Sequence, residues 1–228
     1  MTKKRLDKEI LIYTIIISSL LFFGGVFIGY NINMDRLSDI QKEINNVNSD
    51  VDNFQLQFLF FDVLGENATC PLLKDTLANI NKKSYEIGSK ITLAGQEGKI
   101  QDYSEQDNLI EEYSRVSVSY WLLANKMKAS CESNATTILF FISKECDNKI
   151  PNPCDDQGYV LTYYKEKFGN DLLVFTLSED VEEASVHVLK DFYNITEYPT
   201  MIVEGDKYEN FVSKAELGII LCEHGMCV

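Results

Sequence analysis

The sequence is poor in basic residues, and this shortage limits the partners that the chain can bind. Lysine and arginine together number 21, against 35 aspartate and glutamate residues, which gives a formal net charge of −14. A surface that binds nucleic acid needs clustered lysine and arginine to neutralise phosphates, so we expect no nucleic-acid partner. The acidic surface is expected to keep the protein soluble without specifying a partner.

The residue sets of several enzyme and metal centres are also missing. The sequence contains no glycine-rich phosphate loop, no internal repeat, and no Ser, His and Asp set typical of hydrolases. His187, one of only two histidines, lies in an amphipathic helical pattern and is expected to face solvent. A zinc site could be drawn only from Cys222, His224 and Cys227, which is one ligand short of a structural site. We therefore expect no metal site and no bound cofactor.

Long apolar runs are absent except at the amino terminus. Residues 10–30 are almost uninterruptedly apolar, and about 20 such residues can cross a membrane as a helix. No small-residue cleavage site follows, so the run predicts a signal anchor, a single transmembrane helix that is not removed. Basic residues precede the run but do not follow it: Lys3, Lys4, Arg5 and Lys8. The positive-inside rule then predicts a cytoplasmic tail over residues 1–9 and a cell-membrane protein whose remaining residues lie outside the cytoplasm.

Two glycines in this run suggest self-association. Gly25 and Gly29 have the Gly-x-x-x-Gly spacing that lets two membrane helices approach closely. Glycine is also common in such helices without this role. The spacing therefore has two interpretations, a homodimer that forms through this helix or no role in association.

Two further features agree with a location outside the cytoplasm. All six cysteines follow the apolar run, and an even set is expected to form disulfides in an oxidising compartment. Three asparagines stand in Asn-x-Thr motifs for N-glycosylation, although such short motifs also arise by chance: Asn67, Asn134 and Asn194. We predict a disulfide-bonded glycoprotein.

Residues 31–134 predict an extracytoplasmic helical bundle. Apolar residues recur from Leu37 to Phe61 at alternating spacings of three and four, which is typical of the seam of a long helix. Thr69 and Pro71 mark the start of a second helix, and a third is expected over about residues 102–128. Three helices joined by short turns should fold antiparallel, as a bundle or stalk.

This bundle predicts which cysteines pair. The start of the second helix and the end of the third lie at the same end of an up-down-up bundle, so Cys70 is expected to form a structural disulfide with Cys131. Cys222 and Cys227 are close enough in sequence to form a second structural disulfide with each other.

The remaining residues, 135–228, alternate strand and helix patterns. Strands are expected over residues 137–143, 172–178, 200–204 and 207–212, and helices over 154–168, over 181–193 and from 213 onward. Right-handed crossovers make the first two strands parallel. A turn at Gly205-Asp206 makes the last two antiparallel.

This order, with Cys146 after the first strand, Cys154 at the start of the first helix and Tyr198-Pro199-Thr200 before the third strand, resembles the thioredoxin-like superfamily. The resemblance covers residues 135–228 and implies an α/β thioredoxin-like domain. It implies that the Cys146–Cys154 pair faces a cis Pro199. It also implies that Tyr198, Pro199 and Thr200 bind the backbone of an extracytoplasmic protein or peptide substrate.

The chain departs from the family pattern around the cysteines. Seven residues separate Cys146 from Cys154 where the family's working motif has two, Glu145 replaces a frequent tryptophan, and Phe140 stands where a buried acid often occurs. Two functions therefore remain open. One is a thiol-disulfide oxidoreductase or isomerase in which the helix amino terminus stabilises a Cys154 thiolate. The other is a non-catalytic binding or scaffold module whose cysteines all form structural disulfides.

Overall fold

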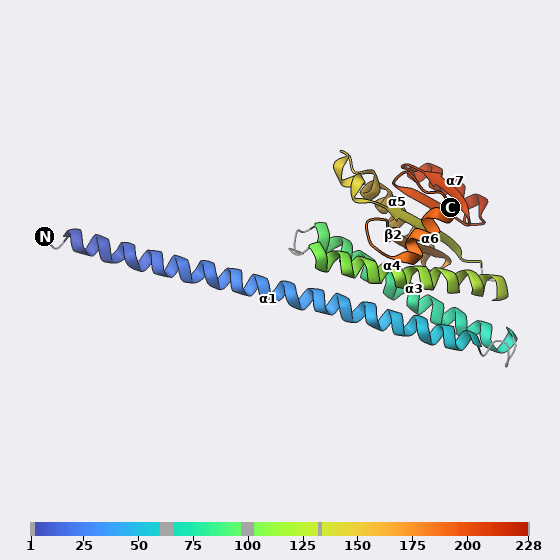
Figure 1. Cartoon of the computed structure of the whole chain (residues 1–228), viewed down its shortest axis with the longest axis horizontal. Helices are drawn as coiled ribbons and strands as arrows, with labels where there is room; N and C mark the ends of the chain where they lie inside the picture. The colour runs from blue at the N-terminus through green and yellow to red at the C-terminus, as the bar shows by residue number, and fades with distance from the viewer. Residues whose placement is uncertain (1–2, 60–65, 97–102, 132–133, 228) are drawn as a thin grey trace. The chain divides into compact units, whose positions relative to one another are not determined.

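The computed structural model describes residues 3–59, 66–96, 103–131 and 134–227. The chain divides into two compact units, Met1–Lys42 and Glu43–Val228. The first unit is the amino-terminal part of α1 (Lys3–Leu59), a continuous helix of 57 residues that is drawn in blue in Figure 1. The predicted boundary at residues 134/135, between the helical and the sheet-containing parts, stays a prediction.

The transmembrane helix predicted over residues 10–30 is wrong. Across the described ranges, no helix combines the length and the apolar character that crossing a membrane requires. Residues 10–30 belong to α1, which continues without a break to Leu59. The corrected fold class is one of α-helices with a four-stranded mixed sheet.

The carboxyl-terminal part of α1 runs antiparallel to the next helix, α3 (Glu66–Gln96). Two ion pairs show this direction: Lys90 Nζ lies 2.7 Å from Glu43, and Lys83 Nζ lies 2.5 Å from Asp50. The later residue of α1 pairs with the earlier residue of α3, so the two helices run in opposite directions. The apolar seam predicted here is confirmed where side chains are described, because Ile44, Val47 and Val51 are buried.

α4 (Tyr103–Cys131) packs antiparallel to α3 through one buried tyrosine, Tyr120, and one half-buried tyrosine, Tyr113. Tyr120 Oη donates to the Leu77 carbonyl at 3.0 Å, and Tyr113 Oη donates to the Ser84 carbonyl at 3.2 Å. Burial raises the pKa of Tyr113 to about 12. A Cβ on Gly88 would lie 2.7 Å from the Tyr113 hydroxyl, so the absence of a side chain there permits the close approach. The inner face of α4 consists of its buried residues Leu109, Val116, Tyr120, Leu123 and Met127.

The rest of the second unit is built on the mixed sheet, whose strand order is β2-β1-β3-β4. Its strands are β1 (Thr136–Ile142), β2 (Leu172–Ser178), β3 (Thr200–Val203) and β4 (Asp206–Glu209). The helices between and after them are α5 (Pro153–Phe168), α6 (Ala184–Phe192) and α7 (Lys214–Glu223). β1 pairs parallel with β2 and antiparallel with β3, and β3 pairs antiparallel with β4. The order of strands and helices agrees with the sequence prediction.

Helices cover both faces of this sheet. Phe140 on one face of β1 belongs to a core cluster with Tyr164 of α5 and Leu217 of α7. On the opposite face, the ring of Tyr120 in α4 lies edge-on to Phe175 of β2, with 5.0 Å between the ring centroids. α4 also packs against α6. The continuous apolar sequence of β1 follows from this arrangement, because a strand buried on both faces has no polar side.

Candidate functional site

Local hydrogen bonds fix the backbone at both cysteines of the Cys146–Cys154 disulfide, at the carboxyl end of β1. The chain leaves β1 into a short 3₁₀ helix, η1 (Lys144–Asn148), where the Cys146 amide donates to the Ser143 carbonyl at 3.0 Å. α5 then begins with Asn152 as its N-cap, and the Asn152 side chain accepts from the Cys154 amide at 3.0 Å. The two cysteine Cα atoms lie 5.7 Å apart. Both cysteines therefore lie on backbone that is fixed by local hydrogen bonds.

The strand register brings this disulfide to the same edge of the sheet as Tyr198-Pro199-Thr200. Phe141 of β1 pairs with Thr200 of β3, so the residues after β1 leave the sheet beside those that enter β3. The Tyr198–Pro199 peptide is cis, as is the Ile150–Pro151 peptide between the two cysteines. Tyr198, Pro199 and Thr200 are all buried, which limits the contact that they can make with a substrate.

A charged network that the sequence did not reveal lies at this edge. Glu179 follows β2, and its carboxylate accepts hydrogen bonds from Tyr198 Oη and from Lys190 Nζ of α6. Burial acts to raise the pKa of Glu179, but the hydrogen bonds from Lys190 and Tyr198 outweigh it and hold the pKa below its usual value. Burial raises the pKa of Tyr198, and Glu179, Asp180 and Glu145 raise it further.

The surroundings of the disulfide both favour and oppose a thiolate. Cys146 is 1% exposed and Cys154 is 8% exposed, so Cys154 is the one that an external thiol reaches more readily. Its place in the first turn of α5 favours negative charge, because backbone amides converge there. The acidic side chains of Asp155 and Asp156 in the same turn oppose it. Of the two sulfurs, Cys154 is therefore the one at which an exchange reaction would have to begin.

The Tyr198 hydroxyl is expected to stabilise the fold at this edge. Tyr198→Phe removes one donor to the Glu179 carboxylate, and we expect it to lower the free energy of unfolding by about 1.5 kcal/mol at neutral pH. The pKa of folded Glu179 is lowered, so this contribution is present above the usual pKa of 4.5 and is lost as the pH falls through the folded value. Urea denaturation at neutral and acidic pH measures it. Tyr159→Phe, at an exposed tyrosine of α5, is the control, and equal losses in both variants would contradict the assignment.

The six cysteines form three disulfides, which confirms the prediction that they pair. Besides Cys146–Cys154, the bridges join Cys70 to Cys131 and Cys222 to Cys227, the partners that the sequence predicts. Whether a bridge is structural or exchanges with thiols stays a prediction at this point.

The other predicted site residues are placed as follows. Asn134 and Asn194 are exposed, and the side chain of Asn67 lies outside the described residues, so glycosylation stays a prediction at all three. Over the described part of the chain, no group of His, Cys, Asp and Glu residues could hold a metal ion. Cys222 and Cys227 are bonded to each other, so their sulfurs are not thiolate ligands beside His224.

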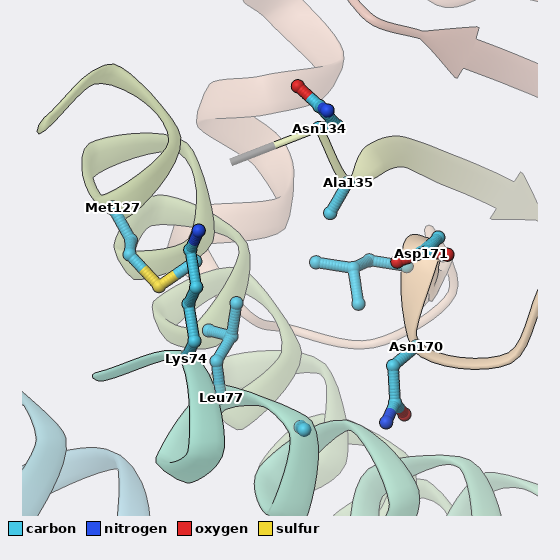
Figure 2. Close-up of a pocket in the computed structure, with 9 residues that line it drawn as sticks. Lys74, Leu77, Met127, Asn134, Ala135, Asn170 and Asp171 are labelled. Carbon is cyan, nitrogen blue, oxygen red and sulfur yellow. The ribbon is translucent and has the colours of Figure 1, made fainter. Parts of the chain in front are cut away.

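A cavity of about 290 Å³ lies away from the Cys146–Cys154 bridge, where α3 and α4 meet the starts of β1 and β2 (Figure 2). Leu77, Met127 and Leu173 supply apolar lining, whereas Lys74 and Asp171 supply opposite charges. Asn134 also lines it, so a glycan at that residue would lie beside the cavity. No sequence pattern indicated this cavity, because its lining comes from segments far apart in the chain.

Lys165 is a buried residue of α5 that sequence reasoning missed. Its Nζ donates three hydrogen bonds, to Asn81 Oδ1 of α3 at 2.9 Å, to the Gly169 carbonyl at 2.8 Å and to the Leu172 carbonyl at 2.6 Å. Burial lowers its pKa to about 8, although the charge of Asp171 acts in the opposite direction. One feature of the sequence could have indicated that Lys165 is buried. It lies four residues after buried Leu161 and therefore on the inner face of the helix.

Comparison with models of known protein families and with curated protein sequences finds no match to this chain.

Proposed function

We propose that the chain is an extracytoplasmic, thioredoxin-like thiol-disulfide oxidoreductase whose Cys146–Cys154 bridge exchanges with protein thiols. The observation that carries the proposal is the pairing of Phe141 with Thr200, because it puts the bridge and the Tyr198-Pro199 turn at one edge of the sheet. The mixed sheet and the order of its strands and helices support the resemblance to the thioredoxin-like superfamily. The proposed roles of the bridge and of Tyr198-Pro199 depend on that resemblance.

The exchange needs no cofactor. A substrate thiolate attacks Sγ of Cys154, a bond forms between the two sulfurs, and Cys146 leaves as a thiolate. A second substrate thiolate then attacks the substrate sulfur of this mixed disulfide, which releases an oxidised substrate and a Cys154 thiolate. Two substrate thiols lose two electrons, and the protein disulfide gains them. The amino terminus of α5 stabilises the Cys154 thiolate that is released in the second step.

The compartment is part of the proposal. No free cysteine remains, and paired cysteines persist in oxidising compartments outside the cytoplasm. The acidic charge of the chain is compatible with a solvated extracytoplasmic domain.

One observation favours a second candidate function, a non-catalytic binding or scaffold module. Cys146, Tyr198 and Thr200 are each at most 5% exposed, which limits access to the bridge and to the residues beside it. In this alternative the Cys146–Cys154 bridge only fixes the loop between β1 and α5.

Differential alkylation of the full chain across a graded series of thiol redox buffers tests the proposal. Peptide mapping then reports each cysteine separately. We expect Cys146 and Cys154 to become reactive at a less reducing potential than Cys70 and Cys131, because exchanging bridges have higher potentials than structural ones. In Cys146→Ser the lone Cys154 thiolate should attack the disulfide of an oxidised substrate, release one substrate thiolate and stay joined to the other sulfur, because Cys146 is no longer there to resolve the mixed disulfide. Reduction of both bridges at the same low potential would contradict the oxidoreductase and support the binding module.

A further inference from the structure

The Cys222–Cys227 bridge is more accessible than the other two. Both of its cysteines are exposed, at the carboxyl end of α7, whereas Cys146, Cys154 and Cys131 are each at most 8% exposed. Thiol-disulfide exchange requires an incoming thiolate to reach a disulfide sulfur, so access contributes directly to its rate. By access alone, this bridge should react first with a thiol in solution.

The chain around this bridge is also held by contacts that do not need the disulfide. Gly225 adopts a φ of +86° and donates its amide to the Cys222 carbonyl at 3.0 Å, and the Met226 amide donates to the Leu221 carbonyl at 2.8 Å. These two bonds form the Schellman motif that commonly ends a helix. Met226 is 7% exposed and belongs to the same core cluster as Leu221.

This motif keeps the two cysteines close when the bridge is open. Their Cα atoms lie 4.0 Å apart, and the hydrogen bonds and the buried Met226 hold the intervening turn in place. Reduction therefore leaves two neighbouring thiols on an unchanged turn, and oxidation can join them again. A bridge that opens and closes without unfolding is suited to reversible exchange.

The position of each cysteine on the helix favours one direction of attack. Cys222 lies in the last turn of α7, where the helix carboxyl end disfavours negative charge, and acidic Glu223 follows it. Cys227 lies beyond the helix. His224 lies between them, with Nε2 3.9 Å from Asp206 Oδ2. Cys227 is thus the better leaving thiolate, and Cys222 is the sulfur that is attacked.

We infer that Cys222–Cys227 is a second exchange site, which reacts reversibly with small-molecule thiols independently of Cys146–Cys154. A small thiolate attacks Sγ of Cys222 and forms a mixed disulfide, and Cys227 leaves as a thiolate. A second small thiolate attacks the sulfur of the bound small molecule, which releases the oxidised small-molecule disulfide and a Cys222 thiolate. Two small thiols are oxidised, one protein disulfide is reduced, and the protein thiolates take up protons from water.

The test uses the full chain in buffers of reduced and oxidised glutathione, followed by alkylation and peptide mapping over time. We expect Cys222 and Cys227 to be alkylated at least about tenfold faster than the Cys70–Cys131 pair, because access differs. In Cys227→Ser, oxidised glutathione should leave a stable glutathione adduct on Cys222. In Cys222→Ser the lone Cys227 thiol lies beyond the helix end, so its adduct should form faster than the Cys222 adduct does in Cys227→Ser, and equal rates would contradict the assigned direction of attack.

Two outcomes would overturn the inference. One is that, in the unaltered chain, the Cys222–Cys227 bridge is reduced no faster than the Cys70–Cys131 bridge. This measurement does not depend on the folding of any variant. The other is that the Cys222→Ser, Cys227→Ser double variant loses its cooperative thermal transition. That loss would show that the turn at the end of α7 depends on the bridge. Peptide mapping reports the Cys146–Cys154 pair separately, so failure of the proposed oxidoreductase and failure of this second site are distinguishable.

Discussion

Replacement of both Cys70 and Cys131 by alanine is expected to lower the free energy of unfolding by about 4 kcal/mol. The bridge joins residues 61 positions apart, from the start of α3 to the end of α4. In the chain-entropy model, a disulfide stabilises a protein by restricting its unfolded chain, and the effect grows with the length of the closed loop. This bridge closes the longest loop of the three, so its removal should have the largest effect.

The matched control is the double alanine variant of Cys222 and Cys227. That bridge joins residues only 5 positions apart, and the same model gives it roughly 2 kcal/mol. The hydrogen bonds of Gly225 and Met226 also hold its turn independently. Urea denaturation of both double variants under oxidising conditions measures the difference. Equal losses would contradict the dependence on loop length, and with it the view that Cys70–Cys131 is the main covalent support of the helical part.

The sequence predicted those features that depend on short-range patterns. The residue pattern at 137–143 predicted the strand β1, and the alternating spacings of three and four predicted the apolar seam of α1, where Ile44 and Val47 are buried. The pairing of Cys70 with Cys131 followed from the expected direction of α3 and α4, because antiparallel helices bring the start of one to the end of the other.

Helix boundaries and the amino-terminal run were predicted less well. Thr69 and Pro71 indicated a helix start, yet α3 begins at Glu66 and contains Pro71. Proline is tolerated near a helix start, where its missing amide breaks few hydrogen bonds, so its position fixes the boundary only approximately. Residues 10–30 were interpreted as a membrane span from their length and apolar composition, the missing cleavage site and the preceding basic residues, and that interpretation did not hold for the described helix.

The polar contacts of the site could not be predicted, because they join residues that are far apart in sequence. Glu179 meets Tyr198 and Lys190 only after β2, β3 and α6 are assembled. Lys165 meets Asn81 across 84 positions. A periodic pattern shows which face of an element is buried, but it does not show which polar side chain on another element will be its partner. Such contacts follow from the packing of elements, which a single sequence specifies only indirectly.

Lys165→Met is the second variant with a large expected effect. The substitution keeps a long flexible side chain but removes the ammonium group, which leaves Asn81 Oδ1 and the carbonyls of Gly169 and Leu172 without this donor. Each buried acceptor left unpaired costs stability, and together we expect a loss of about 3 kcal/mol at neutral pH. Lys167→Met, at an exposed position of the same helix, should change stability little.

The pH dependence of this loss distinguishes the lysine from a simple packing residue. Burial lowers the pKa of folded Lys165 to about 8 from an ordinary value of 10.5, so between these values the unfolded chain holds a proton that the folded chain has released. Stability then rises with pH across this window, by up to about 1.4 kcal/mol per pH unit, and is flat below it. The difference between the unaltered chain and Lys165→Met should therefore widen between about pH 7 and about pH 9.5 in paired urea denaturations. A constant difference would mean that Lys165 titrates normally in the folded protein. A difference near zero at both pH values would mean that its three hydrogen bonds do not stabilise the fold.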